Sequence, residues 1–216
     1  MERSEVWSAT PESHSSGSTQ VLDVGSKTGA AALLFAALGA RTVVALEEDW
    51  RACAAVGVLA EALALDAVVE PLCASLYDVG VLGPGAEAPR RGAFDVAVAS
   101  GVLHTLSDPL LALRLLYGAL RPGGVLLVET PASDLRAPEP APPGRDFHYV
   151  VEYWGASLPG ANAFLPEPKA LARLLADAGF VDVRVTDESP TVIAAARKPD
   201  AYADFRRAGV SQPGVC

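Results

Sequence analysis

The stretch VLDVGSKTG, residues 21–29, decides how this chain folds. Its apolar first half is typical of a strand, and its two glycines permit a tight turn. Residues 28–39, which follow, are apolar and rich in alanine, as expected for a buried helix. A glycine turn between a strand and a helix brings backbone amides close to a ligand. The stretch therefore predicts a ligand-binding unit at the start of an α/β domain.

Strand-like and helix-like runs alternate after this unit. TVVALE (residues 42–47) precedes a helical segment over residues 50–65, and AVVEPL (67–72) comes next. This βαβαβ order implies parallel strands, because each helix crosses back over the sheet. FDVAVAS, PLLALRLLYGAL and GVLLVET, which lie within residues 94–130, continue the alternation. Asp108 and Pro109 predict where the second-half helix begins, and residues 121–124, Arg-Pro-Gly-Gly, predict its end.

The last segment predicts a helix followed by two antiparallel strands, because the two strand-like runs are joined tightly at residues 188–190. We therefore expect an α/β, Rossmann-like fold with a seven-stranded, mostly parallel sheet, one antiparallel C-terminal strand and helices on both faces. The expected organisation is a flexible leader (1–19), one domain (20–198) and a loosely attached tail (199–216). The proline-rich residues 131–144 are expected to form an exposed, lid-like loop.

Composition narrows the class of protein. With 216 residues, of which 50% are hydrophobic, the chain can bury one core. A net charge of −9 repels phosphate backbones, so this reasoning disfavours a nucleic-acid partner and favours a small-molecule substrate. The longest apolar run, residues 29–40, is too short to cross a bilayer, which predicts a cytoplasmic protein with no membrane partner. Monomer and homodimer both stay open.

The three cysteines, Cys53, Cys73 and Cys216, are an odd number without a CxxC pair. This pattern suits a reducing compartment and predicts neither structural zinc nor another metal site. Cys53 and Cys73 are expected to be small core residues.

Two acidic residues accompany the glycine turn. Glu47 ends the second strand 22 residues after Gly25, about where a Rossmann-type domain places a carboxylate for ribose hydroxyls. The dinucleotide pattern GxGxxG fails, because Lys27 stands where its middle glycine is required. Asp23 can instead hold an ammonium group, directly or through water.

Residues 23–29, Glu47, residues 94–130 and the closing LLADAGFVDVRV together resemble class I S-adenosylmethionine-dependent methyltransferases. GVLxxLxDPLLAL and the later Asn162-Ala163-Phe164-Leu165-Pro166 resemble the branch that contains the tRNA wobble-uridine carboxymethyl transferases. The resemblance implies S-adenosylmethionine as cofactor and S-adenosylhomocysteine as product. The cofactor-binding residues that it implies, together with the acidic strand end, are Asp23, Gly25, Ser26, Lys27, Gly29, Glu47, Glu48, Ser75, Leu76, Ser100, Gly101 and Val102.

Two features depart from the family pattern. Lys27 replaces a usual glycine, and in residues 101–106 (GVLHTL) the histidine is displaced by one position from the family's GVLYHL. His104 is the first catalytic candidate, since imidazole titrates near working pH, with Glu129 and Tyr149 as further candidates. Structural roles for His104 and Glu129 remain open. The expected substrate-binding residues are His148, Tyr153, Asn162 and Phe164.

Three functions remain open. The first is methyl transfer to a small molecule, such as a secondary metabolite. The second keeps S-adenosylmethionine but changes the reaction, to intramolecular cyclisation or transfer of another group. The third is a degenerate domain that binds a partner protein, with Lys27 filling the cofactor pocket.

Overall fold

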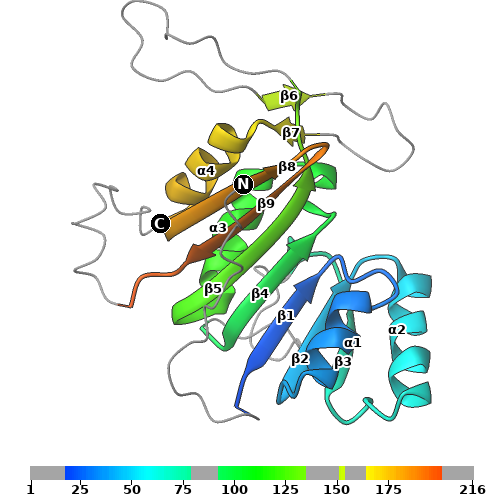
Figure 1. The fold of residues 1–216 in the computed structure, drawn as a ribbon. Coiled ribbons are helices and arrows are strands. Elements are labelled where there is room, and N and C mark those ends of the chain that lie inside the picture. The colour runs from blue at the N-terminus through cyan, green and yellow to red at the C-terminus, as the bar shows by residue number, and fades with distance from the viewer. Residues whose placement is uncertain (1–17, 79–91, 135–150, 154–163, 201–216) are drawn as a thin grey trace, which may run out of the picture.

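The computed structural model describes residues 18–78, 92–134, 151–153 and 164–200. Its main sheet has seven strands in the order β3-β2-β1-β4-β5-β9-β8 (Figure 1). The strands are β1 (Gln20–Val24), β2 (Thr42–Glu47), β3 (Val69–Cys73), β4 (Phe94–Ser100), β5 (Leu120–Pro131), β8 (Val181–Glu188) and β9 (Thr191–Arg197). Strands β1 to β5 pair in parallel, and β9 runs antiparallel to both of its neighbours. The expected fold class is confirmed.

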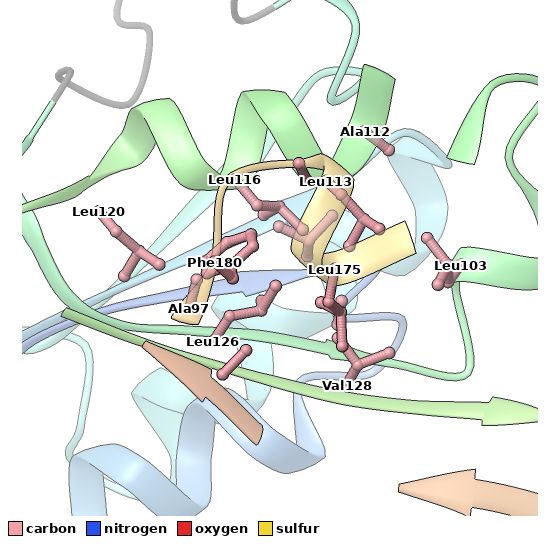
Figure 2. Close-up of a cluster of buried hydrophobic side chains, with 14 of the residues drawn as sticks. Ala97, Leu103, Ala112, Leu113, Leu116, Leu120, Leu126, Val128, Leu175 and Phe180 are labelled. Carbon is pink, nitrogen blue, oxygen red and sulfur yellow. The ribbon is translucent and has the colours of Figure 1, made fainter. Parts of the chain in front are cut away.

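Four helices cover the two faces of this sheet. They are α1 (Ala30–Ala37), α2 (Trp50–Ala62), α3 (Pro109–Ala119) and α4 (Pro168–Asp177). Helices α1 and α2 share one buried cluster with β1 and β2, and α3 and α4 share another with β4, β5 and β9. In the second cluster, Leu116 and Leu175 face Leu126 from the helix side (Figure 2). Each such fully buried side chain contributes about 1.5–3 kcal/mol through loss of apolar surface from water.

Helix α3 begins and ends where the sequence predicts, since its last residue, Ala119, lies just before residues 121–124. The Asp108 side chain accepts a hydrogen bond from the Leu111 N–H at 2.9 Å, and proline occupies the first turn. The predicted stop, residues 121–124, belongs to β5, because Leu120 already pairs with Phe94. The register then jumps to Val96–Val125, so the four residues are accommodated as an irregularity within the strand. Strand β5 therefore begins at the buried Leu120, before the proline and the two glycines that predicted a break in regular structure.

A short two-stranded sheet, not expected from the sequence, consists of β6 (Val151–Tyr153) and β7 (Phe164–Pro166). Ser133, just after β5, holds it by donating its hydroxyl to Glu152 at 2.7 Å and its N–H to the Pro166 carbonyl at 3.2 Å. Nearly all of the expected leader and tail, and most of the proline-rich loop, lie outside the described residues. In the described part of the chain, no helix is both long and apolar enough to cross a membrane.

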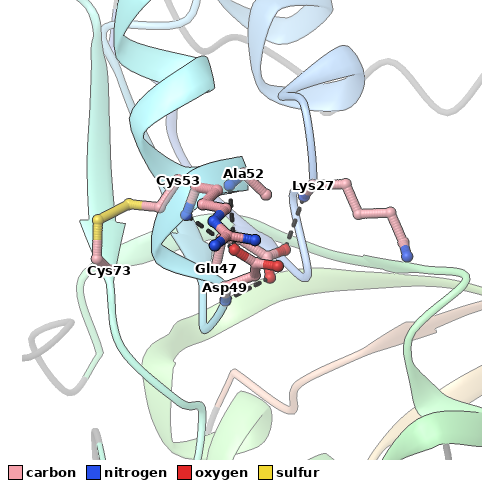
Figure 3. The surroundings of a disulfide bond; sticks show 7 residues. Lys27, Glu47, Asp49, Ala52, Cys53 and Cys73 are labelled. Atoms are coloured by element: carbon pink, nitrogen blue, oxygen red, sulfur yellow. Dashed lines mark hydrogen bonds between the residues drawn. A yellow bond between two sulfur atoms is a disulfide. The ribbon is translucent and has the colours of Figure 1, made fainter. Parts of the chain in front are cut away.

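Cys53 and Cys73 form a disulfide, with their Cα atoms 5.5 Å apart (Figure 3). The expectation that both are small core residues is therefore wrong for Cys73, and the disulfide itself was not expected. Cys53 is fully buried in the first turn of α2, but Cys73 is an exposed residue at the end of β3. The two residues are 20 apart in sequence, yet the crossover connection returns the chain to the same edge of the sheet. Cysteine spacing alone does not reveal this proximity.

Candidate functional site

A cavity of about 220 Å³ lies at the carboxyl ends of β1, β2, β3 and β4. This edge of a parallel sheet is where open α/β folds bind ligands. Eight residues named from the sequence line the cavity, namely Gly25, Lys27, Glu47, Glu48, Ser75, Leu76, Gly101 and Val102. The four others, Asp23, Ser26, Gly29 and Ser100, lie outside its lining.

The turn after β1 packs very closely against Val102 on the opposite wall of the cavity. Gly25 has φ 68°, and a Cβ built there would lie 2.7 Å from Cγ2 of Val102. The Gly25 N–H donates to the Leu46 carbonyl at 2.9 Å, which holds the turn against β2. Glycine is therefore required at this position for two reasons: it adopts the left-handed conformation, and it has no side chain.

Glu47 joins two segments that border the cavity. One carboxylate oxygen accepts a hydrogen bond from the Lys27 N–H at 2.8 Å, and the other accepts one from the Asp49 N–H at 2.9 Å (Figure 3). The residue is only 8% exposed, yet it lines the cavity. A carboxylate has about four lone-pair sites, so these two bonds leave acceptor capacity on each oxygen. Glu47 can thus be held rigidly and still accept further hydrogen bonds from a ligand.

Lys27 takes the conformation that a glycine would adopt. Its φ is 49°, a left-handed value that costs a non-glycine residue roughly 1–2 kcal/mol. Its side chain is exposed and extends away from Glu47 (Figure 3). Lys27 therefore forms part of the cavity wall and leaves the space beside Glu47 open.

Asp23 is buried behind the turn. Its Oδ2 accepts a hydrogen bond from the Ala32 N–H at 3.1 Å, and the residue is 3% exposed. Burial raises the pKa of Asp23 to about 6, with a smaller raising effect from Glu47, while the Ala32 N–H opposes the shift. Asp23 is therefore a buried carboxyl group that changes charge close to neutral pH.

The other three residues outside the lining have different surroundings. The Ser26 hydroxyl is buried and has no hydrogen-bond partner among the described residues. Gly29 lies against α2, where an added Cβ would be 3.1 Å from Cγ1 of Val56. The exposed Ser100 instead takes part in a second polar group beyond β4 and β5.

This polar group surrounds the turn after β4. The Ser100 hydroxyl donates to the Glu129 carboxylate at 2.9 Å, and the Gly101 N–H donates to the Glu129 carbonyl oxygen at 2.9 Å. His104 follows in the 3₁₀ turn η2 (Leu103–Thr105), where its Nδ1 is buried without a partner among the described residues. Burial lowers the pKa of His104, Glu129 opposes this shift and Lys27 adds to it. Neutral imidazole is therefore the prevailing form at pH 7.

Tyr77, the residue after Leu76, connects two walls of the cavity through a contact with Asp108 that the sequence did not predict. Its hydroxyl accepts from the Asp108 N–H at 2.9 Å and donates to the Asp108 carbonyl oxygen at 3.0 Å. The loop after β3 is thereby tied to the start of α3. The other lining residues not named from the sequence are Val24, Leu46, Ala74, Thr105, Leu106 and Ser107. The first three end the strands or follow them directly, a placement that the strand pattern could have indicated.

The expected substrate residues are only partly described. His148, Tyr149 and Asn162 lie outside the described residues. Tyr153 and Phe164 are paired across β6 and β7, with ring centroids 4.6 Å apart and planes inclined by 31°. Tyr153 is 61% exposed, and β7 packs against η2, which carries His104.

Residues 8–185 match the family described as methyltransferase domain. The chain belongs to this family. It is thus a member of the class I S-adenosylmethionine-dependent methyltransferase superfamily. A tRNA U34 carboxymethyltransferase from Chromohalobacter salexigens is 39% identical over 129 residues, covering 57% of this chain and 36% of the relative. One from Methylococcus capsulatus is 30% identical over 178 residues, covering 80% and 48%. The chain thus spans a third to a half of the length of these relatives.

Solved structures agree on the fold. An S-adenosylmethionine-dependent methyltransferase from Mesorhizobium loti superposes with a TM-score of 0.62 at 17% identity, covering 85% of this chain and 92% of that one. The Burkholderia thailandensis 1,6-didemethyltoxoflavin-N1-methyltransferase, solved with S-adenosylhomocysteine, has a TM-score of 0.61 at 21% identity, covering 84% and 71%.

The comparisons correct one expectation. The argument from net charge disfavoured a nucleic-acid partner, but both relatives are named for a reaction at a tRNA nucleoside. Net charge averages over the whole surface, whereas binding of a phosphate backbone depends on the local distribution of charge.

Replacing Gly25 with alanine should destabilise the fold by about 1–3 kcal/mol, because the new methyl group would overlap Val102. Gly39→Ala is the matched control, since Gly39 has φ 93° but nothing within 4 Å of the added Cβ. Urea unfolding of both variants measures the difference. An equal loss of stability in the two would show that left-handed strain, and not the approach to Val102, makes glycine necessary at residue 25.

The buried Asp23 should make stability fall as the pH rises from about 4 to 7. Its folded pKa of about 6 lies above the ordinary value of 3.8, so the folded state binds this proton more tightly than the unfolded chain. The stabilisation is complete below pH 4 and is lost as the pH rises through 6, by roughly 3 kcal/mol at most.

Asp23→Asn should remove this part of the pH dependence of the unfolding free energy, measured by urea titration at several pH values. Asp66→Asn, at an exposed position, is the control and should leave the profile unchanged. A profile of Asp23→Asn that parallels the unmodified protein would contradict the assignment.

Proposed function

We propose that this cavity holds S-adenosylmethionine with the ribose hydroxyls at Glu47, the adenine along Ser75 and Leu76, and the methionine ammonium near Asp23. The observation that carries the proposal is the Glu47 carboxylate, fixed by the Lys27 and Asp49 N–H groups on the cavity wall. The Gly25 turn packs against Val102, and both residues line the cavity beside Glu47. The residues that line the cavity therefore fit the groups that S-adenosylmethionine presents.

The acidic residues also suit the charge of this ligand. When bound, S-adenosylmethionine supplies a methyl group on positively charged sulfur, and its transfer leaves a neutral thioether. The chain must then hold the acceptor in line and keep water away, which can account for a large part of the rate. Asp23 offsets cationic charge best when ionised, so its raised pKa predicts weaker cofactor binding in acid.

His104 is the proposed acceptor of the proton that leaves the substrate. A lowered pKa keeps its imidazole neutral and able to accept a proton at pH 7. Glu129 lies close enough to favour the protonated form, and Ser100 fixes the orientation of the Glu129 carboxylate. The partly buried η2 turn places these groups beside Gly101 and Val102, which line the cavity.

The first acceptor to test is a tRNA nucleoside, because the relatives named above act at tRNA position U34. A small-molecule acceptor is the second candidate to test. The names of the relatives also include carboxymethyl transfer, so the group transferred should be measured along with the acceptor. The mass added to the product distinguishes methyl from carboxymethyl transfer, and a rearranged acceptor of unchanged mass would indicate cyclisation.

Glu47→Gln should weaken binding of S-adenosylmethionine and S-adenosylhomocysteine about tenfold or more, because the new amide NH₂ faces a backbone N–H and a charged acceptor is lost. Isothermal titration calorimetry gives both dissociation constants. Glu61→Gln is the matched control, since Glu61 is an exposed glutamate of α2 outside the cavity lining. Full affinity in Glu47→Gln would remove the basis of the proposal.

His104→Asn should lower kcat by roughly 10²–10⁴-fold and leave the S-adenosylhomocysteine dissociation constant unchanged. Release of S-adenosylhomocysteine with unmodified tRNA, and separately with small-molecule hydroxyl or amine acceptors, supplies the rate. At saturating cofactor, kcat of the unmodified protein should fall in acid as the imidazole takes up a proton, at a pH below the ordinary histidine range because the pKa of His104 is lowered, and the variant should lack this limb. A variant that keeps both rate and pH limb would leave His104 a structural residue.

A further inference from the structure

We propose that Cys53 and Cys73 form a reversible redox site that controls how tightly the cavity binds its cofactor. This inference rests on the proposed function, because it concerns regulation of the same site. The disulfide connects the first turn of α2 with the end of β3 close to Glu47 (Figure 3). Oxidation therefore ties together two backbone segments that each lie next to a hydrogen-bond partner of Glu47, the proposed ribose-binding residue.

On the α2 side, the disulfide reaches Glu47 through Asp49. The Cys53 N–H donates to the Asp49 carbonyl oxygen at 2.8 Å, and the Asp49 N–H donates to the Glu47 carboxylate at 2.9 Å. The Asp49 side chain also caps the helix, accepting from the Arg51 N–H at 2.8 Å. The position of the Asp49 N–H is thus fixed by the same turn of helix that carries Cys53.

On the β3 side, the disulfide ends directly at the cavity. Cys73 is the register partner of Glu47, and the next residue, Ala74, donates its N–H to the Glu47 carbonyl oxygen at 3.1 Å. Ala74, Ser75 and Leu76 then form one wall of the cavity. A change in the position or order of Cys73 is therefore transmitted to the proposed adenine-binding segment within one to three residues.

Opening the disulfide should loosen this end of α2 without unfolding the domain. Further along the helix, α2 remains packed on β3, where Gly57 lies beside Pro71. Val56 and Ala60 stay buried in the cluster that α2 shares with α1 and β2. The disulfide thus acts at the cavity end of the helix, and the apolar contacts hold the rest.

The two cysteines differ in their exposure to solvent. Cys53 is fully buried, whereas Cys73 is exposed. A thiolate of an external dithiol can attack Sγ of Cys73, forming a mixed disulfide while Cys53 leaves as a thiolate and takes up a proton. The second thiol of the reductant then displaces Cys73. In balance, two electrons and two protons pass to the protein, which gains two thiols, and the reductant becomes a disulfide.

The test uses the full chain with Cys216→Ser, which leaves only the two cysteines of interest. Calorimetry measures the S-adenosylhomocysteine dissociation constant after equilibration with oxidised glutathione and again in dithiothreitol, and thiol titration in each state counts free thiols. We expect no free thiol and tight binding in the first state, and two thiols with about tenfold weaker binding in the second. This change is comparable with the cost of reordering one backbone residue on binding.

Cys53→Ser/Cys73→Ser, added to the same background, should bind as weakly as the reduced protein and ignore dithiothreitol. Hydrogen exchange at residues 49–53 and 74–76 should be faster in the reduced protein and in this variant than in the disulfide form, while exchange in β1 and β4 stays unchanged. Equal dissociation constants in the disulfide form and in the reduced, two-thiol form would overturn the proposal. Two free thiols after equilibration with oxidised glutathione would overturn it as well. If neither form binds S-adenosylhomocysteine while the thiols titrate as expected, the proposed function is overturned, and the proposed redox control falls with it.

Discussion

The Glu47 carboxylate is the interaction on which the site depends, since it accepts hydrogen bonds from the turn after β1 and from the start of α2. Two orphan N–H groups from different segments are satisfied by one buried, charged acceptor, and such charge-assisted bonds are among the stronger ones in proteins. The same carboxylate lies on the cavity wall. The group that orders the site is therefore also the group best placed to contact a ligand.

Close backbone packing surrounds this carboxylate. Gly25 is held against Val102, so the turn can approach the wall formed by the segment after β4. Behind the turn, Asp23 is buried with a raised pKa, which places a carboxyl group of variable charge near the expected cationic part of the cofactor. On the other side, Ser100, Glu129 and His104 form the polar group at which an acceptor could lose a proton. The two proposed functions, holding the cofactor and receiving the proton, thus occupy neighbouring strand ends of one sheet.

Sequence reasoning predicted most of the sheet, because strand and helix periodicities alternate clearly and crossover connections permit few topologies. It also named Gly25, Glu47 and Gly101, because ligand sites in such sheets occur at strand ends. It did not predict that Tyr77 bonds to Asp108, a residue 31 positions away. It also missed β6 and β7, which are three residues each and too short for a period to be recognised. The expectation that a nucleic-acid partner is unlikely rested on net charge, which does not describe a local surface, and the names of the relatives contradict it.

The sequence by itself determined the α/β class, the strand–turn–helix unit and the identity of the acidic residue at the end of β2. Local conformational preferences and hydrophobic periods are enough for these features, since both are properties of neighbouring residues. Only the tertiary structure decided that Cys53 meets Cys73, that Lys27 leaves the cavity open and that Ser100 reaches Glu129. These contacts depend on how separate elements come together at one edge of the sheet, and that placement results from packing of the whole core.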